Sequence, residues 1–428
     1  MIGIYSYNES MKLVFFFIVS VTLFFLTPTF ISAQTLTGDA NGDGKVDGSD
    51  FIIWINHYGT QIGGIQNGDF NGDNKVNGID YIDWLSNYGK ALATITPTNP
   101  PISQQKGIWI SADEIAKLPT TGSAWDRVLS AANSNWGSAC LNDLNCLHDT
   151  NTLAGALVAV RLNDSAMRNK TIAGIQSAMV SPLYRTLELA RNIQCYIIAA
   201  DIIGYHDPSF ENWLRAVLDK PLPGRAGIPT VWQGALQDAT NWGNHQRAAS
   251  IAAYIYLGDT NRVSQAANAY KEYIGLSVSS RTLTYDATNW IADQNNKAGI
   301  NRLGATIQGV HISGVLPEDW RRGAEFQWPP TASGYMLEGM QGFVVSSVIL
   351  QRAGIVSFSA SDNAVVRAMN MLYGQGEAAQ NSPVFTYIPT GDDTWIPWVV
   401  NYYGNTSYPT TSASPGKNMG WTDWMYGK

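Results

Sequence analysis

The sequence predicts a mainly helical protein with two parts. One is a small domain of paired calcium loops, and the other is a large α/α toroid, an incomplete barrel of helical hairpins. Two observations support this prediction. A twelve-residue pattern of oxygen-bearing side chains occurs twice near the N-terminus, thirty positions apart. After residue 106, apolar residues recur at helical spacing in long segments separated by short polar turns. A chain of 428 residues has room for both parts.

The N-terminus has the composition of a secretory signal peptide. Lys12 precedes the apolar run 13–26, and small residues follow before residue 34. We therefore expect residues 1–33 to be removed on export, which makes the mature protein secreted, extracellular, attached to the cell surface, or periplasmic. An uncleaved membrane anchor is the alternative, although Pro28 counts against a continuous spanning helix. After cleavage we expect no stable membrane span.

Residues 39–50 and 69–80 have the spacing of calcium-binding loops. In both segments Asp, Asn and Asp occupy the first, third and fifth positions, and Asp occupies the twelfth. Ca²⁺ takes roughly six to eight oxygen ligands on a sharply turning backbone, and Gly44 supplies such a turn in the first loop. The predicted ligands are Asp39, Asn41, Asp43, Asp47 and Asp50, and then Asp69, Asn71, Asp73, Asn77 and Asp80.

Each loop leads into a short apolar helical stretch, 51–58 or 81–88, and a glycine follows each stretch. Two such loops with two short helices resemble the dockerin module of bacterial glycan-degrading systems, over about residues 38–90. A dockerin characteristically closes its loop with Asp, as Asp50 and Asp80 do. The resemblance implies structural Ca²⁺ and a cohesin-type or cell-surface protein as partner.

Composition constrains the remaining chain. The net charge of −7 and the absence of a basic segment argue against nucleic-acid binding. Cys140 and Cys146 flank a short loop and are able to form a disulfide in an oxidising compartment, whereas Cys195 lies in a helical pattern and is expected to be a buried thiol. Residues 91–106 are rich in Pro, Thr and Ser and are expected to be a linker.

Residues 107–428 are expected to form a single core of helical hairpins. Short polar turns at Asn163-Asp164 and Gly258-Asp259 each separate two segments with helical periodicity. Such pairs fit a toroid whose hairpins circle a central cleft, with a plain helical bundle as the alternative. Aromatic segments 395–403 and 421–426 are expected as loops that line the cleft. The predicted helical segments are 153–162, 167–179, 183–203, 248–257, 263–274 and 342–353.

Two further segments carry candidate chemistry. Residues 241–245 contain an Asn-His pair at the start of a helix that we expect to begin near Arg247. Residues 317–342 combine arginines and aromatic residues before another helix. Taken singly, the first segment is also consistent with a capping and packing pair, and the second with a surface loop.

Together, these segments resemble the alginate lyase superfamily of α/α-toroid polysaccharide lyases. Its marks are an Asn-His pair at a helix start and a later Arg-Gly element followed by Tyr, which correspond to Asn244-His245, Arg322-Gly323 and Tyr335. The resemblance implies β-elimination on a polyuronate of the alginate or glucuronan type, with no catalytic metal. Asn244 and Arg322 would bind the substrate carboxylate, His245 or a tyrosinate would take the C5 proton, and Tyr335 would protonate the leaving oxygen. The expected substrate contacts are Arg191, Asn192, Trp242 and Trp328.

Two alternatives remain at this stage. An inverting glycoside hydrolase on the same toroid would need two carboxylates separated widely enough to admit a water molecule. The candidates for that pair are Asp238, Glu318, Asp319 and Glu338. The second alternative is a non-catalytic glycan-binding component.

Overall fold

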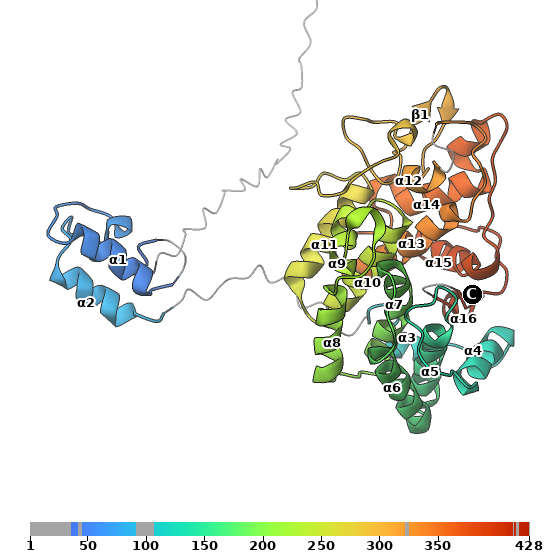
Figure 1. The fold of residues 1–428 in the computed structure, drawn as a ribbon, viewed down its shortest axis with the longest axis horizontal. Helices are drawn as coiled ribbons and strands as arrows, with labels where there is room; N and C mark the ends of the chain where they lie inside the picture. The colour runs from blue at the N-terminus through green and yellow to red at the C-terminus, as the bar shows by residue number, and fades with distance from the viewer. Residues whose placement is uncertain are drawn as a thin grey trace, which may run out of the picture. The chain divides into compact units, whose positions relative to one another are not determined.

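The computed structural model describes residues 36–41, 45–90, 107–321, 325–413, 415–416 and 419–427. The predicted signal peptide (1–33) and linker (91–106) lie outside the described residues, as do Asp43 and Arg322. The chain divides into two compact units, residues 1–98 and 99–428 (Figure 1). We call the described part of the first the paired-loop unit and that of the second the helical unit.

The paired-loop unit contains helices α1 (Gly48–His57) and α2 (Gly78–Asn87) and a short 3₁₀ turn, η1 (Ile65–Asn67). Both helices begin three residues before the predicted stretches because a capping box starts each one. The side chain of Asp47 or Asn77 accepts the first free N–H groups, and the Asp at the end of each loop accepts the N–H of the cap residue.

The two halves of this unit exchange hydrogen bonds. The indole N–H of Trp54 in α1 donates to the carbonyl oxygen of Asn77 at 3.0 Å, and that of Trp84 in α2 donates to Asp47 at 3.1 Å. Each indole therefore holds the cap residue of the other helix. Two backbone hydrogen bonds repeat the exchange, from Gly59 to Val76 at 2.8 Å and from Gly89 to Val46 at 2.9 Å.

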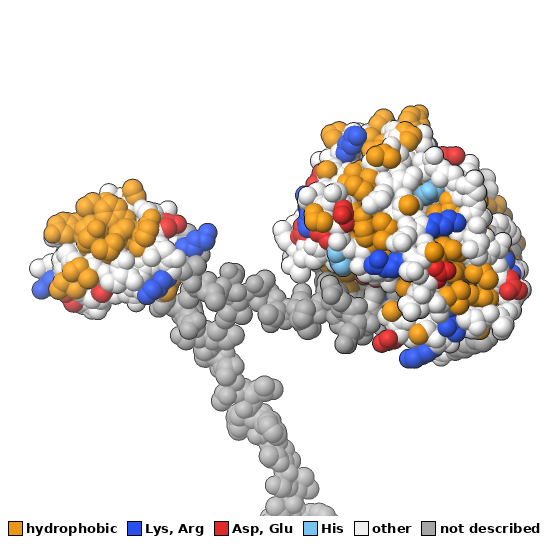
Figure 2. Space-filling model, turned by 90° about the horizontal axis from the view of Figure 1, so that it is seen from below, with side chains coloured by type: hydrophobic (Ala, Val, Ile, Leu, Met, Phe, Trp, Pro, Cys, Tyr) orange, Lys and Arg blue, Asp and Glu red, His pale blue; other side chains and the backbone are white. Residues whose placement is uncertain are grey.

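Large apolar side chains lie exposed on the same unit at positions that repeat between the halves. Ile52 and Ile82 are 58% and 60% exposed, and Tyr58 and Tyr88 are each 56% exposed. Figure 2 shows a broad area of hydrophobic side chains on this unit. Exposed patches of this kind mark sites of protein association. The apolar face consists of Ile52, Ile55, Tyr58, Ile79, Ile82, Leu85 and Tyr88.

The helical unit is mainly helical, as the sequence predicts. Among its described residues the only strands are β1 (Thr306–Ile307) and β2 (Val310–His311), which pair antiparallel. The helices are α3 (Ala112–Ala116), α4 (Ser123–Asn133), α5 (His148–Leu162), α6 (Ser165–Met179), α7 (Thr186–Ile202), α8 (Pro208–Leu218), α9 (Val231–Gln237), α10 (Asn241–Tyr256), α11 (Thr260–Tyr273), α12 (Pro317–Trp320), α13 (Tyr335–Arg352), α14 (Ala360–Tyr373), α15 (Ile396–Gly404) and α16 (Thr422–Tyr426). Short 3₁₀ turns are η3 (Arg225–Gly227), η4 (Thr288–Trp290), η5 (Gly376–Gln380) and η6 (Gly391–Asp393).

A series of buried helices forms the centre of this unit. Helix α5 packs on α7, α7 on α10, and α10 on α13 (Figure 1). Helix α6 packs on α5 and α7, while α9 and α11 pack on α10. The central helices are buried on nearly all sides.

Two predicted hairpin turns are confirmed. Between α5 and α6, Asn163 takes the left-handed conformation and the side chain of Asp164 accepts from the N–H of Met167. Between α10 and α11, Gly258 has φ +68° and Asp259 caps the next helix. In both turns one residue ends a helix and the next residue starts another.

The largest differences from the prediction are the starts of α10 and α13 and the two aromatic segments. Helix α10 begins at Asn241 rather than near Arg247, because the buried carboxylate of Asp319 accepts the free N–H of Asn241 in the first turn. Tyr335 is the first residue of α13 and does not precede it. The segments expected as aromatic loops contain helices α15 and α16, and Pro397 lies in the first turn of α15, where its missing N–H costs nothing.

The cysteine prediction is confirmed. Cys140 and Cys146 form a disulfide, and Cys195 is a buried cysteine of α7 that is not disulfide-bonded. None of the described helices combines the length and the hydropathy that a membrane span requires.

Candidate functional site

A cavity of about 330 Å³ lies in the helical unit where α7, α10 and α13 begin. It contains four residues that the sequence marks as site candidates: Arg191, Trp242 and Tyr335 for the lyase, and Glu338 for the hydrolase alternative. The full lining is Leu144, Arg185, Leu187, Arg191, Asn241, Trp242, Gly334, Tyr335 and Glu338.

A close contact between α10 and α13 places these residues together. A Cβ atom at Gly342 would lie 2.4 Å from the backbone carbon of Asn244 and 2.5 Å from the nitrogen of His245, so only glycine fits at this point of α13. The first turn of α13, which carries Tyr335 and Glu338, therefore lies against the first turns of α10. The close approach brings His245 within 3.7 Å of Glu338, measured from Nε2 to Oε2.

Glu338 is the centre of the charged cluster in the cavity. Its Oε2 forms an ion pair with the guanidinium of Arg191 at 2.6 Å, and the imidazole of His245 lies near the same oxygen. Arg191 also donates to Gln341, whose amide donates to Asp393. Arg191 is only 2% exposed, and an arginine so buried needs this kind of pairing.

A second carboxyl group interacts electrostatically with Arg191. Asp149 in α5 is fully buried, and burial raises the pKa of this carboxyl to about 8 despite the opposing charge of Arg191. Asp149 is therefore protonated at neutral pH. Under these conditions, Glu338 is the carboxylate that balances Arg191. A nearby imidazole, that of His148, is also kept neutral because burial lowers its pKa to about 4.

Asn244 has a different environment from the one expected. Its side-chain amide donates to the hydroxyl of Tyr273 at 2.9 Å and to the carbonyl of Gly339 at 3.1 Å, and its oxygen accepts from Arg247 at 3.0 Å. The residue is 1% exposed and does not line the cavity. This geometry differs from the expectation that Asn244 donates to a substrate carboxylate. Its amide instead ties α10 to α11 and α13.

Two predicted substrate contacts also lie outside the cavity lining. The amide of Asn192 donates to the carbonyls of Cys140 at 3.3 Å and Asp143 at 2.9 Å, so it holds the disulfide loop whose Leu144 forms part of the cavity wall. Trp328 donates its indole N–H to Pro383 at 2.8 Å. Asn192 therefore supports the cavity wall, and Trp328 contacts a separate loop at Pro383.

His245 and Tyr335 differ strongly in exposure. His245 is fully buried beneath Glu338, whereas Tyr335 is 45% exposed at the start of α13 and lines the cavity. A ligand in the cavity therefore meets Tyr335 directly and reaches the imidazole only past Glu338. The remaining predicted catalytic residue, Arg322, lies outside the described residues.

Sequence reasoning missed Arg185 at the rim of the cavity. It precedes α7, and its guanidinium lies 5.4 Å from the ring centre of Tyr184 and 5.5 Å from that of Trp242. The signal available in the sequence was its place six residues before Arg191, but no motif marked it.

The four carboxylates considered for hydrolysis do not gather in this cavity. Asp238, Glu318 and Asp319 are at most 2% exposed. Glu318 accepts from two backbone N–H groups and from Arg321, and Asp319 accepts from Asn241. Among these four residues, Glu338 is the one that lines the cavity. The arrangement offers no carboxylate pair for a hydrolase there.

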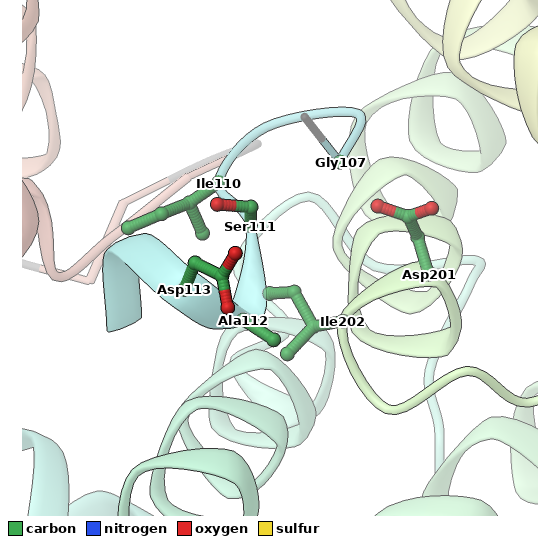
Figure 3. A pocket seen from close by; sticks show the side chains of 7 residues that line it. All are labelled: Gly107, Ile110, Ser111, Ala112, Asp113, Asp201 and Ile202. Carbon is green, nitrogen blue, oxygen red and sulfur yellow. The ribbon is translucent and has the colours of Figure 1, made fainter. Parts of the chain in front are cut away.

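A second cavity of about 220 Å³ lies beside the start of α3 (Figure 3). The carboxylates of Asp113 and Asp201 are both at its edge. Asp201 accepts the backbone N–H of Ile108 at 2.7 Å, and burial raises its pKa. This carboxylate therefore anchors the first residues of the helical unit to α7.

The second loop of the paired-loop unit is ordered by its own predicted ligands. Asp80 is fully buried and accepts from the N–H groups of Phe70, Asn71 and Asn77. Asp69 is 3% exposed and accepts from four backbone N–H groups between residues 64 and 74. The corresponding Asp50 in the first loop is also fully buried and accepts from Ala40, Asn41 and Asp47.

These loops fit a calcium ion by the chemistry of their donors. All predicted ligands are oxygen donors, which Ca²⁺ prefers. Neither Asp69 nor Asp80 forms an ion pair with a Lys or Arg of the described chain, so a divalent cation would supply the charge that these buried carboxylates lack. Within the described residues, which leave out Asp43, no three Asp, Glu, His or Cys side chains converge as a metal site.

Asn244→Ala is expected to lower the free energy of unfolding of the helical unit by about 2 kcal/mol or more, because Tyr273 and Arg247 lose a buried partner. Urea denaturation followed by circular dichroism measures the effect. Asn268→Ala, which removes an exposed amide contact to Ser280, is the matched control and should cost much less. Unchanged stability in Asn244→Ala would contradict the structural role.

Asp149 should make the stability of the helical unit depend on pH. Its pKa is 3.8 in an ordinary setting and about 8 when folded, so between these values the folded state holds a proton that the unfolded state does not. The free energy of unfolding of the wild type should therefore fall, relative to Asp149→Asn, as the pH rises from about 4 to about 8. Urea denaturation across this range measures the difference, and a difference that does not vary with pH would contradict the assignment.

Comparison with known proteins identifies the smaller unit. Residues 37–88 match the family model of the dockerin type I domain. A search of curated proteins found no match to the chain. The paired-loop unit, with its two loops and two short helices, is a dockerin type I domain.

Proposed function

We propose that the helical unit is a polysaccharide lyase that cleaves a polyuronate of the alginate or glucuronan type by β-elimination. The observation that carries the proposal is the cavity that Tyr335 and Arg191 both line, with His245 beneath Glu338. The α/α toroid remains part of this proposal. The pairing of α5 with α6 and of α10 with α11 supports it.

The reaction has simple requirements. A base takes the C5 proton, the electrons of the C5–H bond form a C4=C5 double bond, and the C4–O4 bond breaks. The departing O4 takes a proton, and the charge that develops on the uronate carboxyl group must be stabilised. A cavity for this reaction needs an acid–base hydroxyl or imidazole and a cation.

Tyr335 is the best placed acid–base group because its side chain is exposed in the cavity. Arg191 supplies the cation, and in the substrate complex the uronate carboxylate would share or replace the position that Glu338 holds beside it. His245 adjoins the same position and acts as the second acid–base group once Glu338 is displaced. Arg322 is proposed from the resemblance alone, and Asn244 acts as a positioning residue.

The proposed role of the dockerin type I domain is attachment. We propose that its apolar face binds a cohesin-type protein and thereby attaches the lyase to an extracellular, cellulosome-type assembly. Ca²⁺ held by the two loops is proposed to have a structural role in this attachment, with no part in catalysis.

Ultraviolet absorbance of the new C4=C5 bond tests the reaction on alginate and polyglucuronate. Tyr335→Phe and His245→Ala should each lower kcat by about 100-fold or more, because each removes a proton-transfer group. Tyr402→Phe is the matched control, since Tyr402 is similarly exposed at 47% but does not line the cavity, and it should retain wild-type turnover. Thermal unfolding verifies that each variant is folded.

Two outcomes would refute the proposal. A folded wild type that forms no unsaturated product on any polyuronate would rule out elimination. Wild-type rates in both Tyr335→Phe and His245→Ala would rule out the assigned roles.

Removal of calcium should affect the dockerin type I domain alone. A chelator is expected to speed amide hydrogen exchange in residues 36–90, because Asp69 and Asp80 lose their countercharge, and to leave exchange in the helical unit unchanged. Mass spectrometry measures exchange in both units of the same sample, and cleavage of the polyuronate is assayed in parallel. Loss of cleavage on chelation would show that a metal acts in the helical unit.

A further inference from the structure

The rim of the cavity carries a second arginine that the proposed reaction does not use. Arg185 lines the cavity together with Arg191, Trp242 and Tyr335, and its side chain is 35% exposed. Arg191, by contrast, is buried and paired with Glu338. The two arginines thus differ in depth, and the outer one is accessible to a ligand without any rearrangement of the helices.

Three neighbours fix the orientation of Arg185. Its Nε and Nη2 both donate to Oε1 of the buried Glu188, with the Nε bond at 2.8 Å. The rings of Tyr184 and Trp242 both lie within cation–π distance of the guanidinium. A long side chain held in this way loses little further rotamer entropy when it binds a ligand.

The contact with Glu188 uses one edge of the guanidinium and leaves another edge available. Arginine has five N–H groups in a planar fork. Glu188 takes the edge formed by Nε and Nη2, and Nη1 donates to no residue that the structure describes. The edge formed by Nη1 and Nη2 has the geometry that binds a carboxylate in bidentate fashion. The hydrogen bond to Glu188 raises the pKa of Arg185, so the group remains fully charged.

We propose that Arg185 forms a rim subsite that binds the carboxylate of a uronate residue neighbouring the one that is cleaved. This inference rests on the proposed function, because it assumes an acidic polysaccharide in the cavity. The subsite recognises a sugar carboxylate through the free edge of the guanidinium, and Tyr184 and Trp242 hold that edge in place. Arg185 is therefore a specificity-determining residue for acidic over neutral chains.

Arg185→Lys is the variant that tests the subsite. Lysine retains a cation for Glu188 and so protects the fold, but its single ammonium group has no second edge for a ligand. Arg262→Lys is the matched control. Arg262 also lies over two aromatic rings, those of Trp232 and Tyr254, pairs with Asp219 and is 30% exposed, but it does not line the cavity.

Binding is measured by calorimetry with the full chain carrying Tyr335→Phe, so that the probe is not consumed. The probes are tetrasaccharides of mannuronate, guluronate and glucuronate, and the same tetrasaccharides with their carboxyl groups reduced to alcohols. Arg185→Lys should weaken binding of at least one acidic probe by about tenfold or more, and it should not change binding of the reduced probes. Arg262→Lys should bind all probes as the parent does.

Steady-state kinetics in the otherwise wild-type chain give a second readout. Arg185→Lys should raise KM about tenfold and change kcat by less than about twofold, since the rim contact is equal in ground and transition states. Three results would overturn the subsite. Arg185→Lys binds the acidic probes as tightly as the parent does, or it loses equal affinity for acidic and reduced probes, or the parent binds no acidic probe. If the parent binds acidic probes through Arg185 but the wild type forms no unsaturated product, the subsite stands and the proposed reaction fails.

Discussion

The contact between α10 and α13 at Gly342 is the constraint on which the cavity depends. With no side chain at this position, the two helices approach until the backbone of one meets the backbone of the other. This approach sets the distance between His245 of α10 and the residues Glu338 and Tyr335 of α13, and Arg191 joins them from α7. The amide of Asn244 then fastens the contact to α11. A larger residue at 342 would separate His245 from Glu338 and Tyr335.

The charge balance of the cavity follows from the same packing. Arg191 and Glu338 neutralise one another at the cavity wall, and Asp149, which also interacts with Arg191, is kept protonated by burial. An anionic ligand at this point therefore competes with an internal carboxylate for Arg191. This competition lowers the affinity for the anionic ligand. It also improves discrimination against neutral ligands, because a neutral group has no means of displacing Glu338.

The sequence predicts the helices of this chain far better than the contacts of its polar side chains. The hairpin turns at Asn163-Asp164 and Gly258-Asp259 are local events, set by a left-handed residue followed by a capping side chain, and a sequence pattern contains that information. The start of α10 was missed because the partner of its first N–H is Asp319, far away in the chain. Arg191, Trp242 and Tyr335 reach the cavity as expected, whereas the amides of Asn244 and Asn192 point to structural partners that only the packing reveals.

In the dockerin type I domain, two copies of one sequence pattern fold as a single unit. The indole of each half holds the cap residue of the other, and the chain after each helix bonds to the opposite loop. Each half thus receives hydrogen bonds from the other, so we expect the two to order together, and a disturbance in one loop reaches its twin through an indole and through backbone hydrogen bonds. For the duplicated element the smallest stable unit is therefore the pair, and the two loops are thermodynamically coupled rather than independent.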